Sequence, residues 1–549
     1  MQSTPSTSDI DVLQLPLPVT LYRRAQALPD RLFLEEVDGG SVTYSQLLQQ
    51  VGQFVTTLEE ADIAADSRVA VMVPQSIQAH VAWQAIAWLK AWEVPINNEF
   101  HGEMLAYVLN NSRSRVAVTV AEFLPAICAI EDRLAHLETV ILLDELPDTA
   151  LQTRLDLRQH GADQQVSLKV AREPDLGPQD VATVIYTSGT TGPSKGVVVP
   201  WGEFFTAFGI YGCKRDGLDA MYTPFPINHL SGKVPVFLMA SFCGRSVLRR
   251  RFSTSDFWKD VCERSCTTTI LIGGTATFLI NQPEDEHDRS HVMRNVVMAP
   301  VMENYTDFEA RFGFPIMTIY GMSECGFPFV SPPEGLVNAA SCGRLRKGWH
   351  VRIVDPSGQD VPAGEVGELL VRCDTPHSVL REYLDNPEAT AKALQDGWFH
   401  TGDAFRKDED GNYYFVDRLK DAIRRRGENI SSFEVESFIL RYAGIAECAA
   451  VAVPSETGED EIKVVLTAIP GVRIDLPDLA AYCEREMPRF MVPRYFELKD
   501  ALPYTPTNKV RKADLRKEGM AAAVWDRLAS SSVSSPYRKT HKQGVQNVE

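Results

Sequence analysis

Short runs of apolar residues alternate with segments of helical spacing along most of the chain. The runs at 68–73, 94–97 and 116–120 are typical of buried strands, whereas apolar residues at 45–58 and 80–91 recur at helical intervals. Strands that alternate with helices of this length predict an α/β fold with a parallel sheet.

The second half of the chain has a different pattern. Short strands separated by turns at 343–372 predict a β-rich portion, and 431–515 predicts a small α/β domain. The run Asp417-Arg418-Leu419-Lys420 is highly charged and marks the boundary between the two parts. We therefore expect a flexible arm at 1–18, a large domain at 19–416, a boundary at 417–420, a small domain at 421–517 and a disordered tail at 518–549.

Composition is typical of a globular protein of more than one domain. With 549 residues the chain is too long for one ordinary core. The formal net charge of −18 argues against nonspecific binding to nucleic acid, since a polyanion would be repelled. The ten cysteines form no C-x-x-C pair, which makes a zinc site or a disulfide framework unlikely.

The N-terminal segment carries no basic stretch followed by an apolar run, so we expect no signal peptide. No segment approaches 18 uninterrupted apolar residues, so we expect no transmembrane segment. These two observations favour a cytoplasmic location.

The stretch with the clearest chemistry follows an apolar run at 181–186. It reads Thr-Ser-Gly-Thr-Thr-Gly-Pro-Ser-Lys-Gly from 187 to 196. A strand that leads into such a loop gathers backbone N–H groups and hydroxyls around one concavity, with an ammonium at its rim, and this arrangement suits a polyphosphate. The loop lacks the G-x-x-x-x-G-K-[ST] pattern, because Gly196 follows Lys195. The alternative is a glycine-rich surface turn without a ligand. It is the weaker interpretation, because the residues rich in Gly, Ser and Thr directly follow a strand and lead to a lysine.

The sequence YTSGTTGPSKG resembles the signature loop of the adenylate-forming superfamily, which includes acyl-CoA synthetases, adenylation domains of peptide synthetases and luciferases. Further segments resemble motifs of that superfamily in the same order: YGMSE at 320–324, TGD at 401–403, and the run DRLKDAIRRRGENISSFEVE from 417. The resemblance covers roughly residues 19–517. It implies a large N-terminal domain of parallel sheets with helices and a β-rich subdomain, followed by a small mobile C-terminal α/β domain.

The residues of these motifs suit a nucleotide. Tyr320 at a strand end can stack on a purine, and Ser323 can bind a phosphate oxygen. Glu324 can hold Mg²⁺, which needs few carboxylates when phosphate oxygens and water complete its shell. Asp403 is an acceptor-only group that suits the two ribose hydroxyls. The plainer interpretation of Glu324, a carboxylate at a helix start, is weakened by the phosphate loop in the same chain.

The resemblance also implies roles for individual residues. Lys509 matches the catalytic lysine, although Asn508 stands where a glycine is usual; Asn tolerates positive φ better than most residues. His229 matches a histidine near the acyl pocket and thiol entrance, although Asn228 replaces an aromatic residue. Lys420 falls at the hinge position and Gly427 heads a loop that lines the pantetheine tunnel in thioester-forming members. The implied catalytic residues are Lys509, Thr187, Glu324 and His229. The implied nucleotide and cofactor contacts are Thr187, Ser188, Gly189, Thr190, Thr191, Gly192, Lys195, Ala299, Pro300, Tyr320, Gly321, Met322, Ser323, Asp403, Val416, Arg418, Lys420, Gly427 and Glu428.

The implied activity is that of an ATP-dependent acid–CoA ligase. A carboxylic acid and ATP would give an acyl-adenylate and pyrophosphate with Mg²⁺, and coenzyme A would then give acyl-CoA and AMP. The segments REYLDNPEATAKAL and FHTGD resemble most the carnitine/crotonobetaine type of acid–CoA ligase. The implied partners are a small carboxylic acid, ATP and coenzyme A. Formation of a homodimer is a further possibility that the sequence leaves undecided.

Three alternatives remain. A luciferase-like oxygenase shares these motifs and is disfavoured only by its rarity. The chain could transfer the acyl group to a carrier protein or another acceptor, but residues 225–231 have no Asp to hold the amino group of an amino acid. A sensor that binds acyl-adenylate or nucleotide without catalysis is the third alternative. The presence of Lys195, Glu324, Asp403 and Lys509 argues against it.

Overall fold

The protein was analysed as a computed structural model that forms two compact units. Among the described residues, the first unit holds 14–187, 194–401 and 405–415, and the second holds 402–404 and 416–530. The structure describes residues 14–146, 152–161, 164–187, 194–210, 212–213, 217–332, 335–419, 423–425, 428–454, 460–487, 491–504, 510–520 and 523–530.

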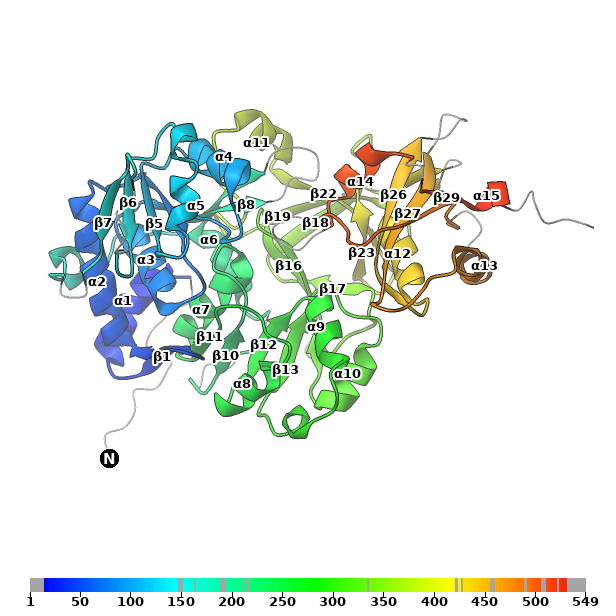
Figure 1. Ribbon diagram of the computed structural model, residues 1–549. Coiled ribbons are helices and arrows are strands. Elements are labelled where there is room, and N and C mark those ends of the chain that lie inside the picture. The colour runs from blue at the N-terminus through cyan, green and yellow to red at the C-terminus, as the bar shows by residue number, and fades with distance from the viewer. Residues whose placement is uncertain are drawn as a thin grey trace, which may run out of the picture. The chain divides into compact units, whose positions relative to one another are not determined.

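A five-stranded parallel sheet of order β4-β3-β5-β6-β7 belongs to the first unit. Its strand β3 is buried on both faces, because Val69 and Val71 point into one core and Ala70 and Met72 into another. The strands are β3 (Arg68–Met72), β4 (Trp92–Pro95), β5 (Val116–Thr119), β6 (Thr139–Leu142) and β7 (Asp156–Gln159), and the nearby helices are α1 (Leu17–Ala27), α2 (Tyr44–Glu60), α3 (Ile77–Trp88), α4 (Gly102–Ser112) and α5 (Leu124–Cys128) (Figure 1).

A second sheet of the first unit has the order β14-β13-β12-β10-β11-β1-β2, and all of its pairs are parallel except the hairpin of β1 and β2. The sequence also predicts this hairpin, because Asp38-Gly39-Gly40 lies between the strand-forming runs at 32–34 and 41–44. The strands are β1 (Leu32–Glu36), β2 (Ser41–Thr43), β10 (Ala220–Thr223), β11 (Arg245–Leu248), β12 (Thr268–Leu271), β13 (Asn295–Met298) and β14 (Ile316–Met317), and the helices among them are α7 (Leu230–Phe242), α8 (Phe257–Glu263), α9 (Gly273–Ile280) and α10 (Tyr305–Phe312).

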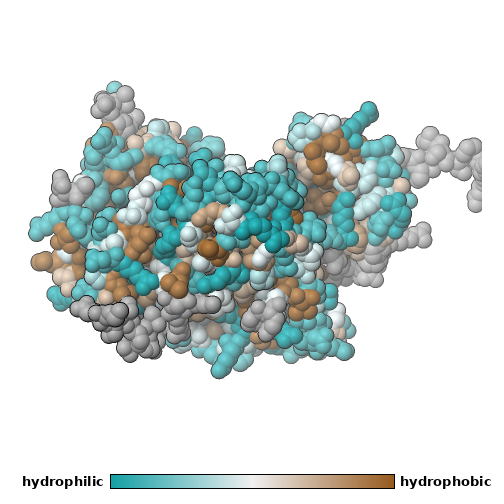
Figure 2. All heavy atoms as spheres, turned by 90° about the horizontal axis from the view of Figure 1, so that it is seen from below, coloured by the Kyte–Doolittle hydropathy of each residue, from teal (hydrophilic) through white to brown (hydrophobic). Residues whose placement is uncertain are grey.

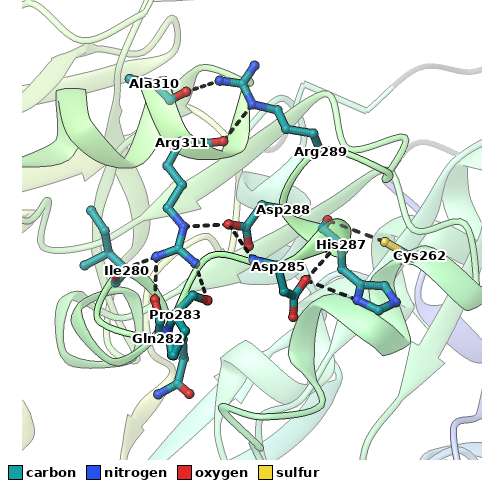
Figure 3. A network of polar contacts seen from close by, with 10 residues as sticks. All are labelled: Cys262, Ile280, Gln282, Pro283, Asp285, His287, Asp288, Arg289, Ala310 and Arg311. Carbon is teal, nitrogen blue, oxygen red and sulfur yellow. Dashed lines mark hydrogen bonds and ion pairs between the residues drawn. The ribbon is translucent and has the colours of Figure 1, made fainter.

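Arg311 of α10 fixes the chain that leaves α9 (Figure 3). Its guanidinium lies 2.8 Å from the carboxylate of Asp288 and donates to the carbonyls of Ile280, Gln282 and Pro283 at 2.7–2.9 Å. A planar guanidinium has five N–H donors in a fixed fork, and this turn offers it four acceptors. Arg311 therefore ties the end of one helix to the next.

The β-rich portion is confirmed as a large sheet of order β15-β16-β17-β23-β22-β19-β18, with β21 paired to β22. A separate three-stranded sheet has the order β20-β9-β8. The strands are β8 (Val181–Thr187), β9 (Lys195–Pro200), β15 (Ile319–Met322), β16 (Gly326–Val330), β17 (Ser341–Leu345), β18 (Trp349–Val354), β19 (Gly367–Cys373), β20 (Glu382–Tyr383), β21 (Leu394–Gln395), β22 (Trp398–Lys407) and β23 (Asn412–Arg418), with helix α11 (Pro387–Ala393).

The second unit is a four-stranded sheet of order β26-β27-β28-β29 with a small hairpin of β24 and β25. Helices α12 and α13 contribute to its own hydrophobic core. Trp525 and Asp526 pair with β28, where the sequence predicts a disordered tail. The elements are β24 (Ile423–Arg425), β25 (Glu428–Ile430), β26 (Ile445–Pro454), β27 (Asp460–Ala468), β28 (Tyr495–Leu498), β29 (Trp525–Asp526), α12 (Ser432–Leu440), α13 (Leu476–Glu486), α14 (Lys512–Glu518) and α15 (Arg527–Ser530).

The surface seen in Figure 2 is mostly hydrophilic, and its hydrophobic residues occur in small separate groups. Within the described ranges, none of the helices has the length and apolar character needed to cross a membrane. All ten cysteines are free.

Candidate active site

The predicted phosphate loop joins the two strands of an antiparallel hairpin. Thr187 ends β8 and pairs directly with Lys195, which begins β9. Both ends of the loop are held from outside, since the hydroxyl of Tyr107 donates to the carbonyl of Ser194 at 2.8 Å and the hydroxyl of Tyr186 donates to Asn111 at 2.7 Å. The loop residues Ser188, Gly189, Thr190, Thr191 and Gly192 lie outside the described residues.

Gly196, directly after the loop, permits another strand to approach. A Cβ at this position would lie 3.1 Å from side-chain carbons of both Leu384 and Val184. Leu384 directly follows strand β20, which pairs with β9 through Tyr383 and Val197. The last glycine of the loop motif thus allows β20 to lie beside the loop.

The predicted metal carboxylate lies in a tight turn. Ser323, Glu324 and Cys325 connect β15 to β16, and Glu324 is 8% exposed. Gly321 is required here, because a Cβ would lie 2.4 Å from the carbonyl oxygen of Gly326. The turn therefore fixes the backbone on both sides of Glu324.

Tyr320 and Met322 belong to the same hairpin. The Tyr320 ring meets Phe405 edge-on at 4.7 Å, and its hydroxyl lies 3.8 Å from the sulfur of Met322. Ala299 and Pro300 follow the carboxyl end of β13, and the Ala299 N–H donates to the carbonyl of Leu271 at 3.1 Å. The carboxyl ends of parallel strands are the usual place for ligands in open α/β sheets.

Two residues near Glu324 were missed by the sequence reasoning. The hydroxyl of Tyr383 donates to Glu324 Oε1 at 3.2 Å, and the ammonium of Lys195 lies 5.0 Å from the centre of the Tyr383 ring. Glu203 of α6 (Trp201–Phe204) is fully buried, and burial, together with the charge of Glu324, raises its pKa well above the usual value. Tyr383 lies in the segment REYLDNPEATAKAL, which the sequence reasoning used only as a sign of the ligase type, and Glu203 lies in no motif.

Glu203 also marks a difference from the predicted secondary structure. The sequence predicts a helix over 201–210, but α6 ends at Phe204 and a 3₁₀ turn follows at Phe205–Ala207. The rings of Phe204, Phe205 and Phe208 all pack on Phe237. This packing accompanies the change from α-helix to 3₁₀ turn at Phe205, and the helical spacing of the sequence does not show where that change falls.

His229 precedes α7 and is half-buried. The first turn of that helix is held by a hydrogen bond from Gln75 to the carbonyl of Gly232 at 3.2 Å and by a buried ion pair of Lys233 with Glu93. The sequence reasoning missed this ion pair, whose members lie on elements far apart in the chain.

In the second unit, Asp403 and Arg418 form an ion pair of 2.8 Å, and Asp403 is 1% exposed. The carbonyl of Val416 accepts a hydrogen bond from the hydroxyl of Ser431. The structure therefore brings together Asp403 and Arg418, both predicted to contact the nucleotide. Lys420, Gly427 and Lys509 lie outside the described residues, and only the backbone of Glu428 is described, in β25.

A further residue of the second unit was not predicted. The ammonium of Lys512 donates to the Ser432 hydroxyl at 2.6 Å and lies 2.7 Å from the Glu436 carboxylate. Asp417 in turn accepts from both the N–H and the hydroxyl of Ser432 at 2.6 Å. These contacts link the end of β23, the start of α12 and the start of α14.

The donor set of the first unit suits Mg²⁺ bound together with phosphates. Glu324 supplies one nearly buried carboxylate, and Lys195 supplies a cation at the base of the loop. No cluster of three or more His, Cys, Asp or Glu that could hold a metal by itself occurs in the part of the chain that is described. A single carboxylate fits an ion whose remaining ligands are phosphate oxygens and water.

Comparison with known proteins gives matches over most of the chain. Residues 21–384 match the family model of AMP-binding enzymes, and residues 434–509 match that of the AMP-binding enzyme C-terminal domain. The crotonobetaine/carnitine–CoA ligase of Salmonella heidelberg (strain SL476) is 31% identical over 489 residues, which are 86% of this chain and 93% of that protein.

Two solved structures share the fold. An anthranilate CoA ligase in complex with anthranoyl-AMP superposes with a TM-score of 0.80 at 22% identity, covering 96% of this chain and all of that one. The o-succinylbenzoate coenzyme A synthetase of Bacillus subtilis in complex with AMP gives a TM-score of 0.78 at 24% identity, covering 91% of this chain and 98% of the other. The fold predicted from the sequence is thereby confirmed.

Proposed function

The chain belongs to the family of AMP-binding enzymes, and we propose that it is an ATP-dependent acid–CoA ligase. The observation that carries the proposal from the structure is the placement of Lys195 and Glu324 on either side of Tyr383. A cation and a carboxylate, beside a loop rich in Gly, Ser and Thr, suit a polyphosphate and its metal ion. The relative at 31% identity, a crotonobetaine/carnitine–CoA ligase, supports coenzyme A as the acceptor.

In the first half-reaction, a carboxylate oxygen of the acid attacks the α-phosphorus of ATP. The bond from that phosphorus to the bridging oxygen breaks, and acyl-adenylate and pyrophosphate result. Thr187, Lys195 and the loop between them hold the β- and γ-phosphates, and Lys509 binds the carboxylate and the α-phosphate. Mg²⁺ held by Glu324 supplies charge neutralisation of the phosphate oxygens. Positioning and electrostatic stabilisation account for most of the catalysis.

The nucleoside contacts follow the same proposal. Tyr320 stacks on the adenine beside Ala299 and Pro300, Ser323 binds a phosphate oxygen, and Asp403 accepts the two ribose hydroxyls. Arg418 pairs with Asp403 and orients its carboxylate, which matches the acceptor-only character of that group.

In the second half-reaction, the thiol sulfur of coenzyme A attacks the acyl carbonyl carbon. The thiol proton is released, the bond from that carbon to the phosphate oxygen breaks, and acyl-CoA and AMP result. The small domain turns about Lys420, so that Lys509 leaves and the Gly427 loop, with Glu428, lines the thiol path. His229 lies at the thiol entrance. One site that is used by two faces of a mobile domain is a hinge mechanism.

Transfer of the acyl group to a carrier protein or another acceptor is the second candidate. It shares the first half-reaction and differs only in the thiol or amine that attacks. A nucleotide sensor without catalysis is the third candidate. Acid-dependent exchange of pyrophosphate into ATP separates a sensor from both enzymes, because a sensor catalyses no exchange.

The deciding experiment is a panel of carboxylic acids assayed for AMP formation with and without coenzyme A. The proposal expects AMP formation that needs both an acid and coenzyme A. Pyrophosphate exchange without any CoA-dependent formation of AMP would favour another acceptor. The absence of pyrophosphate exchange with every acid would contradict the proposal that the protein is an enzyme. A cytoplasmic location and a homodimer belong to the same proposal, and fractionation of cells and light scattering test them.

A further inference from the structure

Tyr383 stands between two groups of the proposed phosphate site. Its hydroxyl donates to Glu324 Oε1 at 3.2 Å, and the Lys195 ammonium lies 5.0 Å from its ring centre. Glu324 comes from the turn between β15 and β16, and Lys195 comes from the start of β9. One side chain thus contacts both the carboxylate and the cation.

The backbone around Tyr383 is fixed to both of these elements. The N–H of Leu380 donates to the carbonyl of Glu324 at 2.7 Å, and the N–H of Leu384 donates to the carbonyl of Gly196 at 2.7 Å. The N–H of Tyr383 itself donates to the hydroxyl of Thr390 in α11 at 2.9 Å. Because the strand is anchored on either side, the ring has a defined place relative to both partners.

We infer that Tyr383 is a positioning residue that orients Glu324 toward the metal ion and Lys195 toward the phosphates of ATP. The inference rests on the proposed function. The hydroxyl acts on Glu324, since a hydrogen bond to a charged carboxylate restricts its rotation. The ring face acts on Lys195, through attraction between the ammonium and the aromatic quadrupole. The two contacts are therefore separable by substitution.

Two variants separate the contacts. Tyr383→Phe removes the hydroxyl and keeps the ring, whereas Tyr383→Leu removes both. The matched control is Tyr414→Phe, which deletes a tyrosine-to-carboxylate hydrogen bond of 2.7 Å to Asp408 elsewhere in the first unit. Calorimetric titration of each full-length variant with ATP, once with EDTA and once with Mg²⁺, measures the affinity without turnover.

For Tyr383→Phe, metal-free ATP binding should match the wild type, and the gain in affinity on adding Mg²⁺ should shrink about tenfold, the value of one hydrogen bond to a charged group. For Tyr383→Leu, metal-free ATP binding should weaken as well, by about threefold to tenfold, the range of an exposed to a partly desolvated cation–π contact. Tyr414→Phe should keep both affinities.

An undiminished Mg²⁺ gain in Tyr383→Phe would overturn the role of the hydroxyl, and metal-free binding unchanged in Tyr383→Leu would overturn the role of the ring. Equal losses in Tyr414→Phe would show a general effect on stability and would also overturn the inference. If the wild-type protein binds ATP and exchanges pyrophosphate, the proposed function stands even when the role of Tyr383 is overturned. If the wild-type protein binds no ATP, both the proposed function and the role of Tyr383 are overturned.

Discussion

The ammonium of Lys233 lies 2.7 Å from a carboxylate oxygen of Glu93, and both side chains are buried in the first unit. Lys233 belongs to the first turn of α7, four residues after His229, and Glu93 belongs to β4. The hydroxyl of Thr183 in β8 donates to the same carboxylate at 2.7 Å. This pair therefore joins the helix behind His229 to the strand that leads into the phosphate loop.

Removal of one partner of this pair should destabilise the protein strongly. Lys233→Met leaves the Glu93 carboxylate buried without its counter-charge, and we expect the free energy of unfolding to fall by about 3–5 kcal/mol. The double variant Lys233→Met with Glu93→Met should be more stable than the single variant, because two apolar side chains of similar length leave no buried charge. Urea unfolding measures both.

The control for this prediction is an ion pair on the surface. Arg115 and Glu138 are 69% and 59% exposed and lie 2.6 Å apart. Arg115→Met should leave the free energy of unfolding close to that of the wild type, since exposed pairs are screened by water. A loss in Lys233→Met no larger than in this control would contradict the importance of the buried pair.

His80 should make the stability of the protein dependent on pH. It is fully buried in α3, neither ring nitrogen has a hydrogen-bond partner among the described residues, and burial, followed by the charge of Lys233, lowers its pKa well below 6.5. Below pH 6.5 the unfolded chain therefore binds a proton at His80 that the folded protein does not. Stability falls with decreasing pH in this window, with a slope of at most about 1.4 kcal/mol per pH unit from this group.

The variant His80→Leu should lose this part of the slope between pH 6.5 and 5. The charge of Lys233 acts on His80 from α7, and Lys233 and its partner Glu93 remain in the variant, so their contribution is common to both proteins. His101→Leu, which replaces an exposed histidine, is the control and should keep the slope of the wild type. Equal slopes for His80→Leu and the wild type, in unfolding series at each pH, would refute the assignment.

Lys512 should stabilise the second unit. It pairs with Glu436, whose pKa is raised mainly by burial, and donates to Ser432. Lys512→Met leaves the Glu436 carboxyl with its remaining hydrogen bond from the N–H of Ala450 but without the ammonium. We expect a loss of about 1–3 kcal/mol, the cost of leaving a buried polar group less satisfied.

Hydrogen exchange resolved by segment should locate the loss from Lys512→Met in the second unit. Lys517→Met, which changes an exposed lysine of the same helix, should leave exchange in α12 as in the wild type. Faster exchange spread equally over both units, or equal exchange in the two variants, would show that Lys512 has no such local role.

Much of the fold follows from sequence because local pattern and tertiary environment agree there. The run at 181–187 is apolar and β-branched, and the structure buries it as β8. The hairpin at Asp38-Gly39 needs only its own turn residues. In contrast, the apolar run at 520–525 is short and precedes a Ser-rich end, and Trp525 forms a strand by pairing with Phe496 of β28, a contact that the local pattern does not show.

The candidate site is predictable only where a motif is contiguous. Thr187, Lys195 and Glu324 stand in runs that indicate a role, whereas the run around Tyr383 indicates none, and its place depends on the pairing of β20 with β9, which lies far away in the chain. Glu203 reads as a polar residue of a helix, and burial beside Glu324 is what makes it unusual. Contacts between distant elements depend on tertiary packing, which cannot be inferred from the local pattern of a single sequence.

Lys509 and Lys420 should separate the two half-reactions of the proposed ligase. Lys509→Ala removes the cation that we propose to bind the carboxylate and the α-phosphate, and we expect acid-dependent pyrophosphate exchange to fall by about a hundredfold or more. Thioester formation from supplied acyl-adenylate and coenzyme A should be largely spared, because the proposal has Lys509 outside the site in that step. Lys420→Pro should spare pyrophosphate exchange and reduce thioester formation, since a fixed φ restricts the hinge and leaves the adenylating state in place.

The control is Lys517→Ala, at the exposed end of α14, which should leave both half-reactions as in the wild type. Equal losses of both half-reactions in Lys509→Ala would remove its assignment to adenylation, and normal CoA-dependent turnover in Lys420→Pro would refute rotation about that residue.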